Sequence, residues 1–217
     1  MAGADSGEAV LALDVDSTIW DLPGAFYGAL SERLGYEVRE EQADSWGYLY
    51  RFGTELVSEC FSEVLSPERM ASRRLYPGLE RALSGLRADG IRLVFVTLNP
   101  EPERLWGPLS QWLSGIVGER VGRLGEEDCS LSVLPPESSK IPVLRQAGAG
   151  GLVDDRPSTI MESVKAGLWT GTIEHSYNRR EVDGMAEVVG FRDWHEFAEK
   201  YASHLPATLP QRALPAA

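Results

Sequence analysis

The feature that most restricts the fold of this chain is an apolar segment that ends in two acidic residues. Residues 9–18 read AVLALDVDST, so Asp14 and Asp16 follow directly after an uninterrupted apolar run. Such a run is typical of a strand that is covered on both faces, as in a parallel sheet. An ionised carboxylate in these surroundings is costly unless it is paired, hydrogen-bonded or bound to a metal. The segment therefore predicts a buried strand that ends at a chemical site.

The same form returns twice later in the chain. Apolar runs at 91–100 (IRLVFVTLNP) and 151–155 (GLVDD) also end in polar residues. Segments 78–90, 102–118 and 157–167 lie between or after these runs, and their apolar residues have helical spacing. Pro108 is expected to interrupt the second of these helices. Alternating strands and helices predict an α/β fold with a Rossmann-like parallel sheet, whose ligands bind beyond the carboxyl ends of the strands.

Residues 23–74 do not fit this alternation. Their pattern is mostly helical, and the segment is too long for an ordinary connection, so it predicts a helical cap inserted over the strand ends. The core would then comprise residues 8–22 and 75–205. A short strand near 169–175, a polar loop at 176–184 and a helix at 191–205 are expected in its last part. The Pro- and Ala-rich residues 206–217 predict a flexible tail.

Composition restricts the partners. The formal net charge of −12 argues against binding a nucleic-acid polymer, because such surfaces need basic patches. No apolar run approaches the roughly 20 residues of a membrane span, and no signal peptide is visible, so we expect a cytoplasmic protein with no membrane partner. Cys60 and Cys129 are not arranged as a disulfide framework or zinc site. The expected partner is a small molecule, and a homodimer is compatible with the sequence.

The DVDST segment offers a specific chemistry. A turn after the strand would gather the carboxylates of Asp14 and Asp16 around a pocket that suits Mg²⁺, which prefers oxygen ligands. One carboxylate can attack phosphorus while the other donates and accepts the proton. Taken alone, the other polar residues have ordinary explanations: Thr97 as a strand residue, Lys140 as a solvated lysine, and Asp154 and Asp155 as caps of the next helix.

The order of these residues resembles the four motifs of the haloacid dehalogenase (HAD) superfamily of phosphohydrolases. That resemblance implies the HAD fold with a C1-type cap between the first two motifs. It implies that Asp14 is the nucleophile that forms an aspartyl-phosphate and that Asp16 is the general acid and base. The implied phosphate-binding residues are Thr97 and Lys140, and the implied Mg²⁺ ligands are Asp14, Asp16, Asp154 and Asp155.

Within the superfamily, the runs VFVTLNP, GLVDDRPSTI, HSYNRR and FRDWHEF resemble the 5'(3')-deoxyribonucleotidases. Two positions depart from that pattern. Ser17 stands where those enzymes usually have Gly, and Leu98 stands where they have Ser. Because Leu98 has no hydroxyl group, we expect Asn99 or a backbone amide to complete the phosphate site.

The cap and the last loop contain candidates for substrate binding. Trp46 and Tyr48 could stack on a nucleobase, although aromatic side chains also form cap cores, and His175 could face the site or lie in a solvated turn. Arg73 is expected on the surface. The preferred substrate is a nucleoside or deoxynucleoside monophosphate. The alternatives are a sugar phosphate or phosphorylated biosynthetic intermediate, and a non-catalytic phosphate-binding module.

Overall fold

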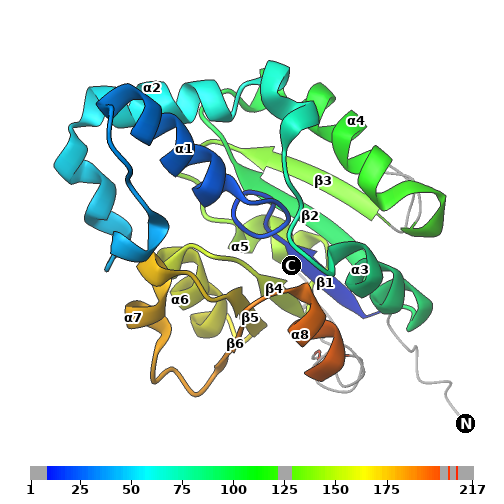
Figure 1. Cartoon of the computed structure of the whole chain (residues 1–217). Helices are drawn as coiled ribbons and strands as arrows, with labels where there is room; N and C mark the ends of the chain where they lie inside the picture. Colours follow the sequence, from blue (N-terminus) through cyan, green and yellow to red (C-terminus); the bar gives the residue numbers. More distant parts are fainter. Residues whose placement is uncertain (1–8, 122–128, 201–204, 206–208, 210–217) are drawn as a thin grey trace, which may run out of the picture.

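A computed structural model describes residues 9–121, 129–200, 205 and 209 of the chain (Figure 1). Its sheet has six parallel strands in the order β3-β2-β1-β4-β5-β6. These strands are β1 (Val10–Leu13), β2 (Arg92–Leu98), β3 (Cys129–Leu134), β4 (Gly151–Val153), β5 (Trp169–Ile173) and β6 (Val188–Phe191). The strand order changes direction beside β1, which is where doubly wound sheets bind their ligands. The predicted α/β, Rossmann-like class is confirmed.

Helices cover both faces of the sheet because the central strands are apolar on both sides. Leu11 and Leu13 of β1 face the cluster formed with α3 (Leu79–Ala88), α4 (Pro102–Val121) and α8 (Trp194–Lys200). Val10 and Ala12 face α5 (Ile141–Gln146) on the opposite side. This alternation follows from the two-residue period of a strand. It explains why the apolar run predicted from the sequence has no polar face.

The predicted helices are present with three differences. Pro108 lies inside α4 and does not end it, so the expected interruption is wrong; Gly107 precedes it and has no Cβ to clash with the proline ring. The expected loop at 176–184 is largely the helix α7 (Ser176–Val182). The expected helix at 191–205 begins later, at Trp194, because Phe191 still belongs to β6. The third helix of the predicted alternation is α6 (Pro157–Lys165).

The chain between β1 and α3 forms the helical insertion, at the upper left of Figure 1. It contains the α-helices α1 (Leu22–Leu34) and α2 (Thr54–Val64) and the 3-10 helices η1 (Glu40–Gln42), η2 (Trp46–Phe52) and η3 (Pro67–Ser72). Its own apolar cluster includes Phe26, Leu30 and Tyr48, and it also takes in Tyr177 from α7. The cap is thereby packed against the last part of the core.

Two backbone hydrogen bonds bring the cap back to its starting point. The amide of Asp21 donates to the carbonyl of Arg74 (2.8 Å), and the amide of Tyr76 donates to the carbonyl of Ile19 (3.1 Å). The segment after β1 is therefore held against the segment before α3, and the cap has two adjacent connections to the core.

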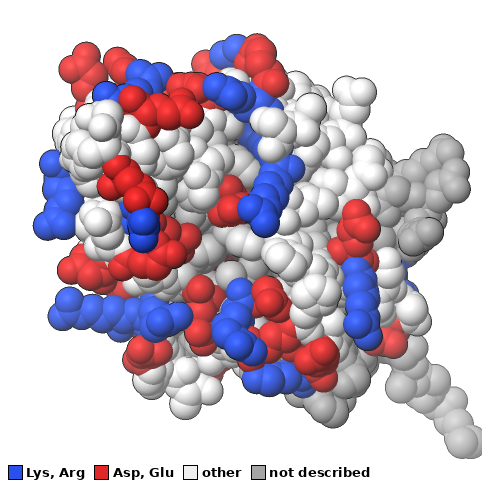
Figure 2. Space-filling view, in the orientation of Figure 1, with Lys and Arg blue, Asp and Glu red and all other residues white. Residues whose placement is uncertain are grey.

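The surface carries mixed charge. Figure 2 shows Lys and Arg side chains interspersed with Asp and Glu on the face that it displays, without a continuous basic area. No helix within the described ranges is both long and apolar enough to span a membrane.

Candidate active site

The polar residues that follow three strands meet at one edge of the sheet. Asp14 follows β1, Thr97 lies near the end of β2, and Asp154 and Asp155 follow β4. The Asp14 amide donates to the carbonyl of Val153 (2.9 Å), so the ends of β1 and β4 are directly joined. Parallel strands bring their carboxyl ends to the same edge, and this places all four side chains around one cavity.

Lys140 joins two of the carboxylates at the base of the cavity. Its ammonium group, at the start of α5, donates to Asp14 Oδ1 and to Asp154 Oδ2, the latter at 2.7 Å. Lys140 is 2% exposed and the two aspartates are 5% and 0% exposed. Burial alone would lower the pKa of Lys140, but the two carboxylates raise it overall. Lys140 is therefore a buried cation shared by two anions.

The charges in this buried centre do not balance. Burial raises the pKa of Asp14 despite the opposing effect of Lys140, and it raises the pKa of Asp155 to about 6. Asp155 accepts a hydrogen bond from the phenol of Tyr177 (2.6 Å). Three buried carboxylates thus face one buried ammonium group. The centre is suited to a further cation.

Asp16 is held in a different way. Its Oδ1 accepts from the indole nitrogen of Trp20 (2.8 Å), and its Oδ2 accepts from the hydroxyl of Thr97 (3.0 Å). The side chain is half-buried. The guanidinium group of Arg73 lies 4.4 Å from the ring centre of Trp20 and is itself buried, so the expectation of a surface position is wrong. The sequence pattern had indicated neither the hydrogen bond from Trp20 to Asp16 nor the packing of Arg73 on Trp20.

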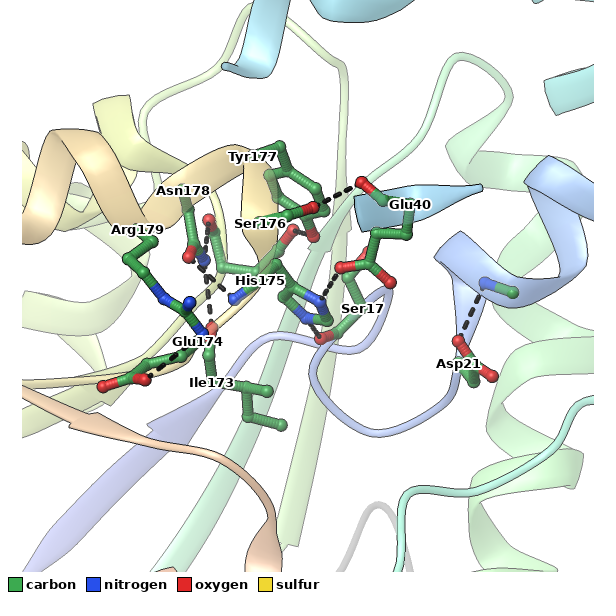
Figure 3. Close-up of polar contacts among 12 residues, drawn as sticks. Ser17, Asp21, Glu40, Ile173, Glu174, His175, Ser176, Tyr177, Asn178 and Arg179 are labelled. Atoms are coloured by element: carbon green, nitrogen blue, oxygen red, sulfur yellow. Dashed lines mark hydrogen bonds and ion pairs between the residues drawn. The ribbon is translucent and has the colours of Figure 1, made fainter. Parts of the chain in front are cut away.

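The turn after Asp16 is held from the cap and from the last part of the core (Figure 3). Ser17 has a φ angle of 60°, a left-handed conformation that favours glycine. Its carbonyl accepts from Nε2 of His175 (2.9 Å), and Nδ1 of His175 lies 2.8 Å from Oε1 of Glu40.

Nδ1 of His175 faces the Glu40 carboxylate, and Nε2 faces the Ser17 carbonyl, with the Tyr76 hydroxyl further away at 3.5 Å. The two nearer partners are acceptors, so this arrangement favours a protonated imidazolium that donates to both. Burial alone would lower the pKa of His175, but the hydrogen bond and charge of Glu40 raise it overall. Because Glu40 belongs to η1, this contact joins the cap, the core and the turn after β1.

We compared the chain with known proteins. No family model and no curated sequence matches it. Solved structures match along nearly the whole chain. A protein described as a predicted phosphatase from Clostridium acetobutylicum has a TM-score of 0.59 and 15% identity over 90% of this chain and 99% of its own. A putative β-phosphoglucomutase from Bacteroides vulgatus has a TM-score of 0.57 and 13% identity, with coverage of 94% and 91%. A HAD family hydrolase from Deinococcus radiodurans, solved with bound phosphate and sodium, has a TM-score of 0.57 and 13% identity, with coverage of 96% and 100%. The chain has the HAD fold.

The HAD fold does not by itself establish a metal centre, so binding of a metal here depends on the donor groups of the site. Across the described ranges, no three His, Cys, Asp or Glu side chains form a ready metal-binding group. Mg²⁺ does not require one, because it commonly takes one or two carboxylates and keeps water or substrate oxygens. The unbalanced carboxylates of Asp14, Asp154 and Asp155 are the right chemical type. The residues present therefore fit Mg²⁺.

The cavity above these residues has a volume of about 320 Å³. The predicted site residues that line it are Asp14, Asp16, Trp46, Thr97, Leu98, Lys140, Asp154 and Asp155. The cavity extends from the carboxylates into the space between the cap and the core, so a molecule bound at the carboxylates would also contact the cap.

Three predicted residues do not line this cavity. The side-chain oxygen of Asn99 accepts from the backbone amide of Glu101 (2.9 Å), so Asn99 organises the start of α4. The backbone amide of Asn99 donates to the carbonyl of Leu134 (2.8 Å). Tyr48 is buried in the apolar cluster of the cap. His175 lies behind the turn at Ser17. Their positions differ from the expected contacts with phosphate or substrate.

Proposed function

We propose that this protein is a Mg²⁺-dependent phosphatase that hydrolyses a small phosphomonoester through an aspartyl-phosphate on Asp14. The observation that carries the proposal is the shared lysine: Lys140 contacts both Asp14 and Asp154 at the floor of an accessible cavity. A carboxylate repels a phosphate dianion, so attack on phosphorus requires positive charge at this position. Lys140 supplies such charge, and Mg²⁺ held by Asp14, Asp154, Asp155 and the backbone carbonyl of Asp16 would supply more when bound.

The proposed reaction has two steps. A carboxylate oxygen of Asp14 bonds to phosphorus while the bond to the leaving oxygen breaks, and Asp16 gives that oxygen its proton. Asp16 then accepts a proton from water, which attacks phosphorus, releases inorganic phosphate and restores Asp14. In this structure one oxygen of Asp16 accepts from Trp20 and the other from Thr97, and each keeps a second lone pair that can carry the proton. If the Thr97 hydroxyl leaves Asp16, it can donate to a phosphoryl oxygen instead.

Two substrate classes have separate support. The resemblance of the late sequence runs to deoxyribonucleotidases favours a nucleoside or deoxynucleoside monophosphate. The structural similarity to a putative β-phosphoglucomutase favours a sugar phosphate. A non-catalytic phosphate-binding module is the rival from another class, but such a module has no use for an acid beside a nucleophile.

The test is phosphate release from nucleoside monophosphates, deoxynucleotides and sugar phosphates, with Mg²⁺ or with EDTA. We expect release only with Mg²⁺. Asp14→Asn should abolish release while Lys140 still pairs with Asp154, and thermal melting would show that the variant folds. Asp21→Asn is the matched control, because Asp21 accepts from the Gly24 amide at the start of α1 and asparagine can do the same. Near-normal turnover by Asp14→Asn would contradict the nucleophile assignment.

A further inference from the structure

The cavity is polar at its floor and apolar along its walls. The apolar wall residues are Leu22, Pro23, Phe26, Leu49, Phe61 and Leu65 from the cap and Leu98, Pro100 and Pro136 from the core. Within the described chain, the cap contributes no Asp, Glu, Lys, Arg or His side chain to this lining. Its polar contributions are the hydroxyl groups of Ser45 and Tyr27 and the indole of Trp46. The core adds the polar side chains of Ser17, Arg156 and Tyr177 to the lining, so the shortage of hydrogen-bond partners is on the cap side of the cavity.

The small number of hydrogen-bond partners in the cap lining restricts which leaving groups can bind there. A sugar carries several hydroxyl groups, and each one that is buried without a partner costs free energy. Sites that select polar substrates place matching donors and acceptors around them. The cap walls of this cavity match an apolar surface instead.

Aromatic side chains shape two parts of the lining. The rings of Phe26 and Phe61 pack at a centroid distance of 4.3 Å. Trp46 packs edge-to-face on Tyr177 (5.3 Å, 73°) and still leaves 42% of its surface exposed. Aromatic walls favour planar rings, which stack or pack edge-on against them.

A second cavity of about 660 Å³ continues from the first. The two share the lining residues Trp46, Leu49, Phe61, Leu65 and Pro100. The second cavity runs between α2 and the start of α4, where Ser58, Ser62 and Arg104 add polar groups. A leaving group larger than the first cavity can extend in this direction and place polar substituents there.

We propose that the leaving group of the substrate carries a planar aromatic ring, which binds between the cap walls and Trp46. This inference rests on the proposed phosphatase function and names its substrate class: a phosphomonoester of an aromatic alcohol rather than of a simple sugar. A nucleobase is one such ring, and simpler aryl-alkyl groups are others. The phosphate lies at Lys140, and the ring lies above it.

The test compares esters whose leaving alcohols have similar reactivity: 2-phenylethyl phosphate, propyl phosphate and glucose 6-phosphate. All three are esters of primary alcohols, so differences report binding rather than leaving-group chemistry. Burial of one phenyl ring should raise kcat/KM for 2-phenylethyl phosphate about 30-fold over propyl phosphate, mainly through a lower KM. Glucose 6-phosphate should be the poorest substrate. Equal or greater kcat/KM for glucose 6-phosphate overturns the inference.

Two tryptophan variants locate the ring. Trp46→Ala should lower the ratio of kcat/KM for 2-phenylethyl phosphate to that for propyl phosphate about fivefold, because it removes one aromatic wall. Trp106→Ala is the matched control: Trp106 is 52% exposed and lies on α4, outside both cavities, so the ratio should not change. Equal ratios in Trp46→Ala and Trp106→Ala overturn the assigned position.

Acetyl phosphate separates this inference from the function on which it rests, because it has no ring. Mg²⁺-dependent hydrolysis of acetyl phosphate that is lost in Asp14→Asn supports the phosphatase function alone. Such hydrolysis without a preference for the phenyl ester overturns only the ring inference. No hydrolysis of acetyl phosphate or of any ester overturns both.

Discussion

Glu40→Gln would test whether the contact between Glu40 and His175 stabilises the packing of the cap against the core. Glutamine keeps an oxygen that can accept from His175 but removes the negative charge. A hydrogen bond between charged groups contributes about 1.5 to 3 kcal/mol when buried. The His175 side chain is 5% exposed but that of Glu40 is 27% exposed, so solvent screens part of this energy. We expect a loss of about 1 to 2 kcal/mol, which lowers the Tm of a chain of this size by about 3 to 6 °C.

The effect should depend on pH with a defined sign. The folded-state pKa of His175 is raised above its ordinary value of 6.5. The stabilisation is therefore fully present below pH 6.5 and is lost as pH rises through the folded-state pKa. The difference in Tm between wild type and Glu40→Gln should be largest near pH 6 and should shrink toward pH 9.

The assay is thermal unfolding of both proteins across this pH range. Glu41→Gln is the matched control, because Glu41 belongs to the same 3-10 helix, is exposed and loses the same charge. Equal Tm values for Glu40→Gln and Glu41→Gln at pH 6 would refute the reasoning. A difference that grows with pH would refute the assignment of an imidazolium.

Two further predictions concern the carboxylates. Burial raises the pKa of Asp155 from 3.8 to about 6, so without metal this group costs stability as pH rises from about 4 to 6, and a bound cation offsets that cost. The increase in Tm on adding Mg²⁺ should therefore grow between pH 5 and pH 7, and an increase that is constant with pH would contradict this account. Trp20→Phe should lower kcat about tenfold with little change in KM, because it removes one of two hydrogen bonds that position Asp16. Trp112→Phe is its control, since Trp112 also packs on Arg73 (5.4 Å) and no hydrogen bond to Asp16 is lost; an equal fall in both variants would assign the effect to packing.

The contacts that sequence reasoning missed depend on where distant side chains point. Trp20 follows the apolar pattern of a core residue, and only the turn at Ser17 directs its indole nitrogen toward Asp16. Glu40 and His175 are 135 residues apart, one in the predicted cap and the other at the end of the strand predicted near 169–175. Tyr48 is one of several aromatic residues in η2, and its burial depends on which side of η2 packs against α1 and α2. No periodicity encodes such rotations.

The sequence by itself determined the α/β class and the edge of the sheet at which the polar residues meet. This is because apolar runs form buried parallel strands and the residues after them necessarily gather at the carboxyl ends. Asp14, Thr97, Asp154 and Asp155 lie at this edge and line one cavity. Only the tertiary structure decided the partners of these groups and the apolar walls above them. Hydrogen bonds and cavity walls depend on the packing of the cap against the core, which brings together residues that no local pattern relates.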